Sequence, residues 1–342
     1  MCIRDSIDFA LSSMSNSHIQ TVAVLTQYNA RSLNEHLSSS KWWNFGRKQG
    51  GLFLFTPTVT ADNSDWYRGT ADAMYQNIDF LKRRHEPYVI ISSGDCVYKL
   101  DFNRVLDFHI EKKSDITVVC KDMMYNDDVS RFGVVRMDDE SRITEFDEKP
   151  IEALSNTIST GIYVIRRRQL IELLEAAAEE NRFDFVNDIL VRYKNVKKIY
   201  GYKINSYWNN IDDIDAYFKT NMDFLRPDIR SYFFREEPTI CSKVDDLPPA
   251  KFNPGSDISN SLVSSGCIIN GSVEDSVLFK QVFVGKNTTV KNCVLLNDVY
   301  IGDNVHLENC IVESRGTINP NTCYCGEDGV MIVKEKNVRY VI

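Results

Sequence analysis

The side chains best suited to chemistry are acidic residues that stand where apolar segments end. Asp95 follows Tyr88–Ser92, an apolar run of strand type. Ligands of open α/β sheets bind beyond the carboxyl ends of the strands. Mg²⁺ takes oxygen ligands, often one or two carboxylates together with phosphates. Asp95 is therefore a candidate metal ligand, and the competing interpretation is an ordinary loop aspartate that caps a turn.

Glu148 and Lys149 form a second candidate, directly before Pro150. A lysine held by a neighbouring glutamate can place a compact positive charge on a phosphate group. The competing interpretation is a solvated charge pair that ends a strand before a proline. These three residues alone decide nothing, and they gain weight only beside other motifs.

A third candidate is the helix start at Gly69, Thr70 and Ala71. The first N–H groups of a helix have no partner within the helix, so such a start favours anions or the edge of an adenine base. The competing interpretation is simple helix entry with Thr70 near the cap position.

The scaffold for these candidates is predicted by the alternation of strand-like and helical patterns over residues 1–225. Strands are expected at Thr21–Leu25, Tyr88–Ser92 and Asp115–Val119, and a helix is expected over Gly69–Arg83. Alternating helices and apolar strands indicate an α/β, Rossmann-like domain whose mostly parallel sheet is covered on both faces.

The pattern changes from about Ile258, where short β-rich stretches repeat every 17 residues. Three apolar columns share this period: Cys267, Val284, Ile301 and Ile318; Val273, Val290 and Leu307; and Leu278, Leu295 and Val312. A common period on three faces predicts a parallel β-helix of the left-handed kind, in which each coil buries its apolar side chains against its neighbours. Gly285 and Gly302 are expected at tight corners. An irregular β-sandwich, the alternative, would not hold one period.

Length and composition agree with this division. A chain of 342 residues is expected to form two domains, here residues 1–228 and 253–342, joined by a linker at 229–252. The net charge of −8 argues against a nucleic-acid partner. There is no apolar run near 18 residues, so no membrane span is predicted. Nine cysteines without tight spacing suit a reducing cytoplasm.

The cysteines and histidines do not predict a metal centre. Cys323 and Cys325 form a C-x-C pair with neither a second pair nor a nearby histidine in sequence, and the five histidines show no ligand spacing. Cys293 and Cys310 share the 17-residue period and are expected to stack as small core or corner residues.

Four segments, taken together, resemble bacterial glucose-1-phosphate adenylyltransferase, the ADP-glucose pyrophosphorylase family. They are Trp66–Ala73, Ser93–Lys99, Glu145–Pro150 and Ser159–Tyr163. Their order and spacing fit that family, as does the C-terminal β-helix, so the resemblance covers roughly residues 7–342. It is closest to the D-type regulatory subunit. It implies a nucleotidyltransferase domain that forms ADP-glucose and pyrophosphate from ATP and glucose 1-phosphate, with Mg²⁺, in glycogen biosynthesis.

The resemblance also implies roles for single residues. Asp95 matches the metal-binding and catalytic aspartate of the family. The implied substrate-binding residues are Tyr67, Gly133, Glu148, Lys149 and Ser159, and the implied nucleotide-binding residues are Gly69, Thr70 and Ala71.

One departure from the family lies in the segment Tyr207–Tyr217. Where the family carries an Arg-Asp pair after Tyr-Trp, this chain has Asn209 and Asn210. Asn210 thus replaces the expected second metal-binding aspartate and offers Mg²⁺ a neutral carbonyl instead of an anion. A catalytic metal stabilises the transition state by several kcal/mol, so this loss predicts a slowing of the chemistry by about 10²–10⁴.

A second departure is at the N-terminus, where the family has a strand and a Gly-rich loop for the triphosphate. Ile7–Leu11 matches the family only after that loop, and Met1–Ser6 matches nothing in it. Both departures predict a regulatory subunit with little or no catalysis of its own. It is expected to join a catalytic homologue in a hetero-oligomer, a heterotetramer, while keeping sugar-phosphate and ATP-type ligands. The alternative is an active adenylyltransferase that uses Asp95 alone for the metal.

Overall fold

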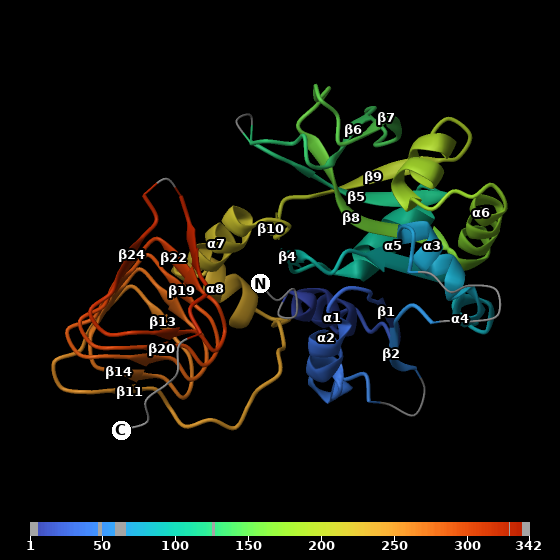
Figure 1. Ribbon diagram of the computed structural model, residues 1–342. Coiled ribbons are helices and arrows are strands. Elements are labelled where there is room, and N and C mark those ends of the chain that lie inside the picture. Colours follow the sequence, from blue (N-terminus) through green and yellow to red (C-terminus); the bar gives the residue numbers. More distant parts are fainter. Residues whose placement is uncertain (1–5, 47–49, 59–65, 125–126, 328, 337–342) are drawn as a thin grey trace. The chain divides into compact units, whose positions relative to one another are not determined.

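The computed structural model describes residues 6–46, 50–58, 66–124, 127–327 and 329–336 (Figure 1). Contacts within the chain divide it after Tyr207 into two compact units, which are described one at a time. This boundary lies inside the predicted first domain, and the boundaries at 228 and 252 stay a prediction.

The first unit contains the predicted alternation of helices and strands. Thr21–Leu25 and Tyr88–Ser92 are confirmed as strands, and the strand expected from Asp115 begins one residue later. The helices are α1 (Ile7–Asn16), α2 (Ala30–Leu37), η2 (Ser40–Trp43), α3 (Thr70–Gln76), α4 (Ile78–Lys82), α5 (Phe102–Glu111), α6 (Arg167–Glu179) and η3 (Val186–Val191). The strands are β1 (Thr21–Leu25), β2 (Gly51–Phe55), β3 (Tyr88–Ser92), β4 (Cys96–Tyr98), β5 (Ile116–Asp122), β6 (Gly133–Met137), β7 (Ile143–Glu148), β8 (Thr157–Arg166) and β9 (Ile199–Ile204).

The α/β class is confirmed, but the prediction of a mostly parallel main sheet is wrong. The six-stranded sheet runs β7-β6-β8-β5-β9, with β3 also paired to β8. Among its described ladders only β5–β9 is parallel, and β3, β5 and β6 all pair with β8 in antiparallel fashion. The reason is that β6, β7 and β8 follow one another without intervening helices, and short connections join antiparallel strands. The separate β1–β2 pair is parallel.

The helix predicted over Gly69–Arg83 is interrupted at Asn77, where α3 ends and α4 begins. The side-chain amide of Asn77 donates to the carbonyl of Ala73 at 2.9 Å and to the hydroxyl of Tyr67 at 3.0 Å. An asparagine side chain that bonds to the backbone four residues earlier competes with the helical pattern. The break therefore has a local cause.

The core of the first unit lies between the central strands and the helices α3, α6 and η3. Its fully buried members include Ile116, Phe146, Ile165 and Leu174. Burying each such side chain contributes about 1.5–3 kcal/mol relative to exposure. Ala71, at the start of α3, belongs to the same cluster, so the start of that helix is held against the core.

The second unit begins with β10 (Trp208–Asn210) and the helices α7 (Ile214–Asp223) and α8 (Pro227–Phe234). The predicted parallel β-helix follows, built from three five-stranded sheets whose ladders are all parallel (Figure 1). Its left-handed winding stays a prediction.

The first sheet of the β-helix contains β11 (Lys251–Phe252), β14 (Ile268–Ile269), β17 (Phe283–Val284), β20 (Tyr300–Ile301) and β23 (Thr317–Ile318). The second contains β12 (Asp257–Ser259), β15 (Ser272–Glu274), β18 (Thr289–Lys291), β21 (His306–Glu308) and β24 (Cys323–Cys325). The third contains β13 (Leu262–Val263), β16 (Val277–Leu278), β19 (Val294–Leu295), β22 (Cys310–Val312) and β25 (Met331–Val333).

The strand register confirms two of the predicted apolar columns and corrects the third. Val273 pairs with Val290, and Leu278 pairs with Leu295, as the period requires. In the remaining column, however, the partner of Val284 is Ile269 and not Cys267. The chain is shorter between β14 and β15 than at the same corner of the neighbouring coils, so the spacing shifts there.

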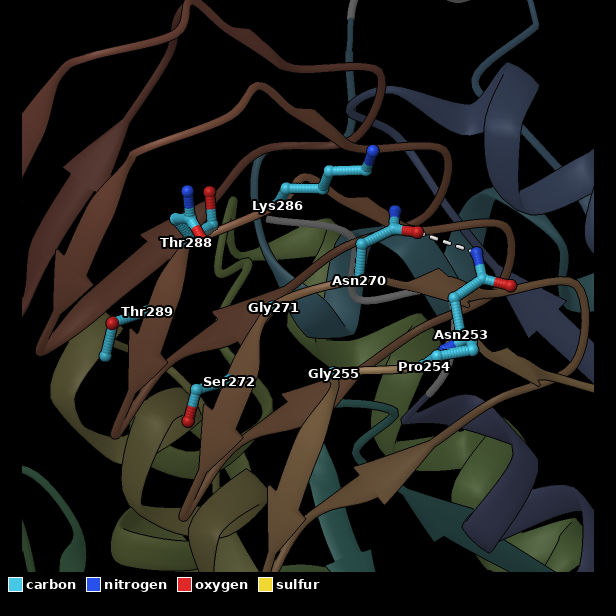
Figure 2. Close-up of a pocket in the computed structure, with 10 residues that line it drawn as sticks. Asn253, Pro254, Gly255, Asn270, Gly271, Ser272, Lys286, Thr288 and Thr289 are labelled. Carbon is cyan, nitrogen blue, oxygen red and sulfur yellow. Dashed lines mark hydrogen bonds between the residues drawn. The ribbon is translucent and has the colours of Figure 1, made fainter.

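A polar hollow of about 560 Å³ surrounds this short corner (Figure 2). Its walls come from successive coils, with Asn253 bonded to Asn270 at 2.6 Å and the side chain of Lys286 lying above them. None of the predicted site residues lines it.

At the corner that holds Gly285 and Gly302, the β-helix is turned by asparagines rather than by the predicted glycines. Asn287, Asn304 and Asn321 all have positive φ angles, and their side-chain amides form a ladder with N–O distances of 3.2 and 3.0 Å. Asparagine tolerates the left-handed conformation because its short polar side chain can bond locally. Gly285 and Gly302 serve a different need, since a Cβ on either would lie within 3 Å of the next coil.

Candidate active site

The Asp95 loop connects β3 to β4 and is held by three polar contacts. The hydroxyl of Ser93 donates to Oδ1 of Asp95, and the thiol of Cys96 lies 3.4 Å from the same oxygen. The hydroxyl of Ser6, just before α1, donates to the carbonyl of Gly94 at 2.8 Å. Asp95 itself is half-buried. Its carboxylate is thus oriented by its neighbours while it keeps access to solvent.

Gly161 of β8 supports this loop from the adjacent strand. Its carbonyl accepts a hydrogen bond from the amide of Ser93 at 3.1 Å. The φ angle of Gly161 is +73°, and a Cβ there would lie 3.3 Å from the Cβ of Ser93. Both the conformation and the space at this position favour glycine.

Glu148 stands at the end of β7, directly opposite Gly133 at the start of β6. A Cβ on Gly133 would lie 2.8 Å from Oε2 of Glu148 and 2.9 Å from the ring of Phe146. The absence of a side chain at Gly133 therefore makes the space that the carboxylate occupies. The predicted substrate-binding residues Gly133 and Glu148 are brought together by strand register.

The surroundings of Glu148 act against its ionised form. Burial raises the pKa of Glu148, the charge of Lys149 opposes this rise, and the charge of Asp184 adds to it. Burial likewise raises the pKa of Tyr163, and the nearby Glu148 contributes to that rise. The hydroxyls of Ser159 and Tyr163 are 3.3 Å apart. Glu148, Ser159, Tyr163 and Asp184 therefore lie together, and we call them the Glu148 cluster.

Lys149 contributes a charge of the opposite sign at the edge of the Glu148 cluster. Its side chain is exposed, and its backbone has a positive φ of 49°. The amide of Lys149 donates to the carbonyl of Phe132 at 3.1 Å. The turn is thus fixed by the backbone, and the ammonium group is left accessible to an anion.

The start of α3 is clamped to the segment that precedes η3. The carbonyl of Phe183 accepts hydrogen bonds from the amides of Ala71 at 2.8 Å and Asp72 at 3.2 Å. The hydroxyl of Thr70 accepts one from the amide of Phe185 at 3.0 Å. A Cβ on Gly69 would lie 2.4 Å from the Phe183 carbonyl oxygen. Glycine is therefore required at position 69 for this close approach.

This clamp corrects the expectation of free amides at the helix start. The N–H groups of Ala71 and Asp72 are engaged by Phe183 and cannot also face a ligand. The assignment of Gly69, Thr70 and Ala71 to nucleotide binding stays a prediction. What the clamp does achieve is to fix the segment that carries Asp184, whose charge reaches Glu148.

Tyr67 lies just before this clamp and is half-buried. Its amide donates to the side-chain oxygen of Gln27 at 2.6 Å, and its hydroxyl accepts a bond from Asn77 at 3.0 Å. The ring is thus oriented from both ends.

Asn209 and Asn210 belong to the second unit. The side-chain amide of Asn209 donates to the hydroxyl of Thr220 on α7 at 2.7 Å. The side-chain oxygen of Asn210 is buried, and no hydrogen bond reaches it from the described residues. A buried carbonyl oxygen without a donor is an energetic cost that native proteins rarely leave uncompensated.

Comparisons with known proteins agree with both units. Residues 3–226 match the Nucleotidyl transferase family, and residues 248–333 match the family described as GlmU-like, C-terminal hexapeptide. Glucose-1-phosphate adenylyltransferase of Clostridium novyi (strain NT) is 38% identical over 82% of this chain and 74% of its own length. The Bacillus subtilis (strain 168) protein of that name is 36% identical over 83% of this chain and 75% of its own length.

The chain belongs to the glucose-1-phosphate adenylyltransferase family. The second match gives the β-helix a family identity as well, that of a hexapeptide-repeat solenoid. None of the helices in the described ranges is long and apolar enough to cross a bilayer.

Two residues of the Glu148 cluster, Tyr163 and Asp184, were not predicted from the sequence. Tyr163 follows Ser159 on β8, and its hydroxyl turns to that of Ser159. Both residues belong to the family-like segment Ser159–Tyr163, but nothing in that segment distinguishes the tyrosine from its neighbours. Asp184 lies outside every recognised motif. Its charge acts on Glu148 because the clamp at α3 holds its segment in place. No sequence pattern near Asp184 predicts this interaction.

Proposed function

We propose that this chain is a regulatory subunit of a glucose-1-phosphate adenylyltransferase, with little or no catalysis of its own. It acts in glycogen biosynthesis in the cytoplasm and assembles with a catalytic homologue into a hetero-oligomer. The observation that carries the proposal is Asn210, a neutral side chain whose buried oxygen has no donor among the described residues. The family resemblance expects a metal-binding aspartate there.

The Glu148 cluster supports the proposal that glucose 1-phosphate still binds. Glu148 is half-buried, and no hydrogen bond reaches its carboxylate within the described part of the chain, so it can accept bonds from sugar hydroxyls. The exposed Lys149 offers its ammonium group to the phosphate. Ser159 and Tyr163 supply hydroxyls beside the carboxylate.

Mg²⁺ fits this chain in part. Asp95 supplies one oriented carboxylate, which together with phosphates is a common way of holding Mg²⁺. At position 210 the chain has a neutral asparagine where the family resemblance expects a second anionic ligand. When bound, the metal neutralises charge on the phosphates. Asp95 would hold it, and Asn210 would not contribute the second anion that favours the transition state.

A subunit of this kind regulates by binding two states of its partner unequally, because only differential affinity shifts an equilibrium. Binding of glucose 1-phosphate to the regulatory chain would then be coupled to turnover in the catalytic homologue. The expected effect of assembly is a change in the kinetics or the effector response of the partner.

The test compares ADP-glucose formation by the chain, by the catalytic homologue, and by their mixture. The parent chain alone should be at least about 10²-fold slower than the homologue, because the second anionic ligand is absent. The mixture should co-elute in size-exclusion chromatography and show altered kinetics. Asn210→Asp should raise the activity of the chain, whereas Asn103→Asp, which adds the same charge at an exposed position of α5, should not. Separate elution with unchanged partner kinetics would overturn the proposal.

The second candidate function is an active adenylyltransferase that relies on Asp95 alone. The contacts that orient Asp95, from Ser93 and Cys96, favour this possibility. Metal-dependent turnover by the parent chain without a partner, lost in Asp95→Asn, would establish it and would exclude a purely regulatory role.

A further inference from the structure

A second cluster of ligating side chains lies on the β-helix, away from every residue considered so far. His306 and Glu308 belong to β21, and Cys323 and Cys325 belong to the neighbouring strand β24. Residues two apart on a strand share one face. The inward positions between them are taken by Leu307, which is fully buried, and by Tyr324, which packs on the core. The four ligating side chains therefore share the outer face.

The parallel register brings these side chains into pairs. His306 stands opposite Cys323, and Glu308 stands opposite Cys325. Oxygen, nitrogen and sulfur ligand atoms therefore meet at four neighbouring positions of one sheet face. Cys323 is exposed, and the other three are half-buried, so a cation can reach the cluster from solvent.

The distances between the ligand atoms suit a tetrahedral metal site. Nε2 of His306 is 3.5 Å from Oε2 of Glu308, and the sulfurs of Cys323 and Cys325 are 3.8 Å apart. The ligand atoms of His306, Glu308 and Cys325 all lie within 4.8 Å of one another. Zinc bonds of about 2.0–2.3 Å at tetrahedral angles separate neighbouring ligands by about 3.3–3.8 Å. Cys323 lies outside this group of three, so its thiol would have to move toward His306 and Glu308 to complete the coordination.

We propose that His306, Glu308, Cys323 and Cys325 bind a divalent cation of the zinc class. Thiolate and imidazole ligands select zinc over Mg²⁺, which prefers oxygen. His306, Glu308 and Cys325 supply three ligands as they stand. Once the exposed thiol of Cys323 joins them, four protein ligands fill a tetrahedral shell and leave no open position, which is the arrangement of structural rather than catalytic zinc.

The ion's effect follows from its place in the fold. Within the described residues, β24 is the last strand of its sheet and has β21 as its one neighbour in that sheet. Each coil of a solenoid is stabilised chiefly by its neighbours, so a terminal coil has half the support of an internal one. A cation bridging β21 and β24 would fasten the terminal coil to the body of the β-helix.

A disulfide between Cys323 and Cys325 is the competing fate of the two thiols. Residues two apart on an extended strand have Cα atoms about 6.6 Å apart, near the upper limit of about 6.8 Å for a disulfide. The strand would have to bend to allow it. The extended pairing of β24 with β21 therefore favours the metal.

The experiment titrates the reduced full chain with Co²⁺, which reports thiolate ligation by a charge-transfer absorption and tetrahedral geometry by its visible bands. One Co²⁺ per chain should bind, and Zn²⁺ should displace it. Cys325→Ser and His306→Gln should each weaken binding by at least about tenfold, because loss of even an indirect partner costs that much at metal sites. Cys241→Ser and His85→Gln, at exposed positions elsewhere, are the matched controls.

Thermal unfolding provides a second measurement that does not depend on colour. Zn²⁺ should raise the melting temperature of the parent and of Cys241→Ser, and should not raise that of Cys325→Ser, because binding to the folded state alone stabilises it. The proposal is overturned if no thiolate absorption appears, if Cys325→Ser binds as tightly as Cys241→Ser, or if mass measurement finds Cys323 and Cys325 disulfide-bonded under the same conditions.

Discussion

The Glu148 cluster and the Asp95 loop each hold a carboxylate at a strand end, and they do so by different contacts. Each carboxylate stands at a strand end of the first unit, and each depends on a glycine of the adjacent strand, Gly133 for Glu148 and Gly161 for the loop of Asp95. Asp95 is held by a hydroxyl and a thiol. Glu148 is desolvated and lies near a second acid, Asp184.

The difference between the two carboxylates indicates a division of labour. The oxygens of Asp95 are oriented in a polar turn, as a group that meets a cation should be. Glu148 has no donor among the described residues, so its charge is poorly compensated until hydroxyl groups of a ligand arrive. A half-buried charge without hydrogen-bond partners lowers the stability of the folded chain. The same charge strengthens the binding of a ligand that supplies those partners. If Glu148 binds the sugar as proposed, ligand binding would supply the hydrogen bonds that its carboxylate lacks among the described residues.

The largest expected effect is on ligand affinity at Glu148. Glu148→Gln should weaken glucose 1-phosphate binding by about 10–150-fold, because hydrogen bonds to a charged group contribute about 1.5–3 kcal/mol. Isothermal titration of the full chain measures this. Glu152→Gln, an exposed acid nearby, should leave the affinity unchanged. Equal affinity of the two variants for glucose 1-phosphate would mean that Glu148 does not bind the sugar, and the contrast drawn between Glu148 and Asp95 would be wrong.

A slightly smaller effect is expected when the space beside Glu148 is filled. Gly133→Ala should lower the free energy of unfolding by about 1–3 kcal/mol, the usual cost of overpacking, because the new Cβ meets the buried ring of Phe146. It should also weaken glucose 1-phosphate binding by displacing the carboxylate. Urea unfolding measures the first effect. Gly94→Ala is the control, since a Cβ there meets nothing within 4 Å.

At the Asp95 loop the corresponding change should act through the backbone. Gly161→Ala should lower the free energy of unfolding by about 1–2 kcal/mol, because an L-residue is forced into the left-handed region at a φ of +73°. Glucose 1-phosphate affinity should change less than in Gly133→Ala. If Gly161→Ala unfolds in urea as Gly94→Ala does, the claim that the loop relies on a strained glycine is wrong.

The smallest effect concerns stability and pH at Glu148. Burial raises its pKa in the folded chain, with Lys149 opposing and Asp184 adding to the rise. A raised folded-state pKa means that the stabilising contribution is present at low pH and lost as the pH rises through that value. Near neutral pH the ionised Glu148 therefore destabilises the fold.

Glu148→Gln should accordingly melt higher than the parent near pH 7, by a few degrees at most. The gap should close as the pH falls through the raised pKa towards the ordinary range of glutamate. Thermal unfolding across this pH range measures the gap, and Glu152→Gln should show none. A variant that melts lower than the parent at pH 7 would mean that the Glu148 charge is better compensated than its surroundings indicate.

Much of the architecture could be predicted from local patterns. Apolar runs located β1 and β3, and the 17-residue period located the columns through Val290 and Leu295. These predictions are correct because periodicity and strand ends depend on residues that are close together in the sequence. The motifs that hold Glu148 and Ser159 could be recognised for the same reason, and strand register then brought Gly133 and Glu148 together.

The rest depended on which distant segments pack together. The sequence by itself determined the α/β and β-helix classes, the family motifs and the substitution at Asn210. Only the tertiary structure decided that β8 runs antiparallel to its neighbours and that the amides of α3 are taken by Phe183. It also decided that Asp184 acts on Glu148, that Tyr163 meets Ser159, and that His306 meets Cys323 one coil later. Such pairings are set by register and close packing across the fold, and no local window of sequence records them.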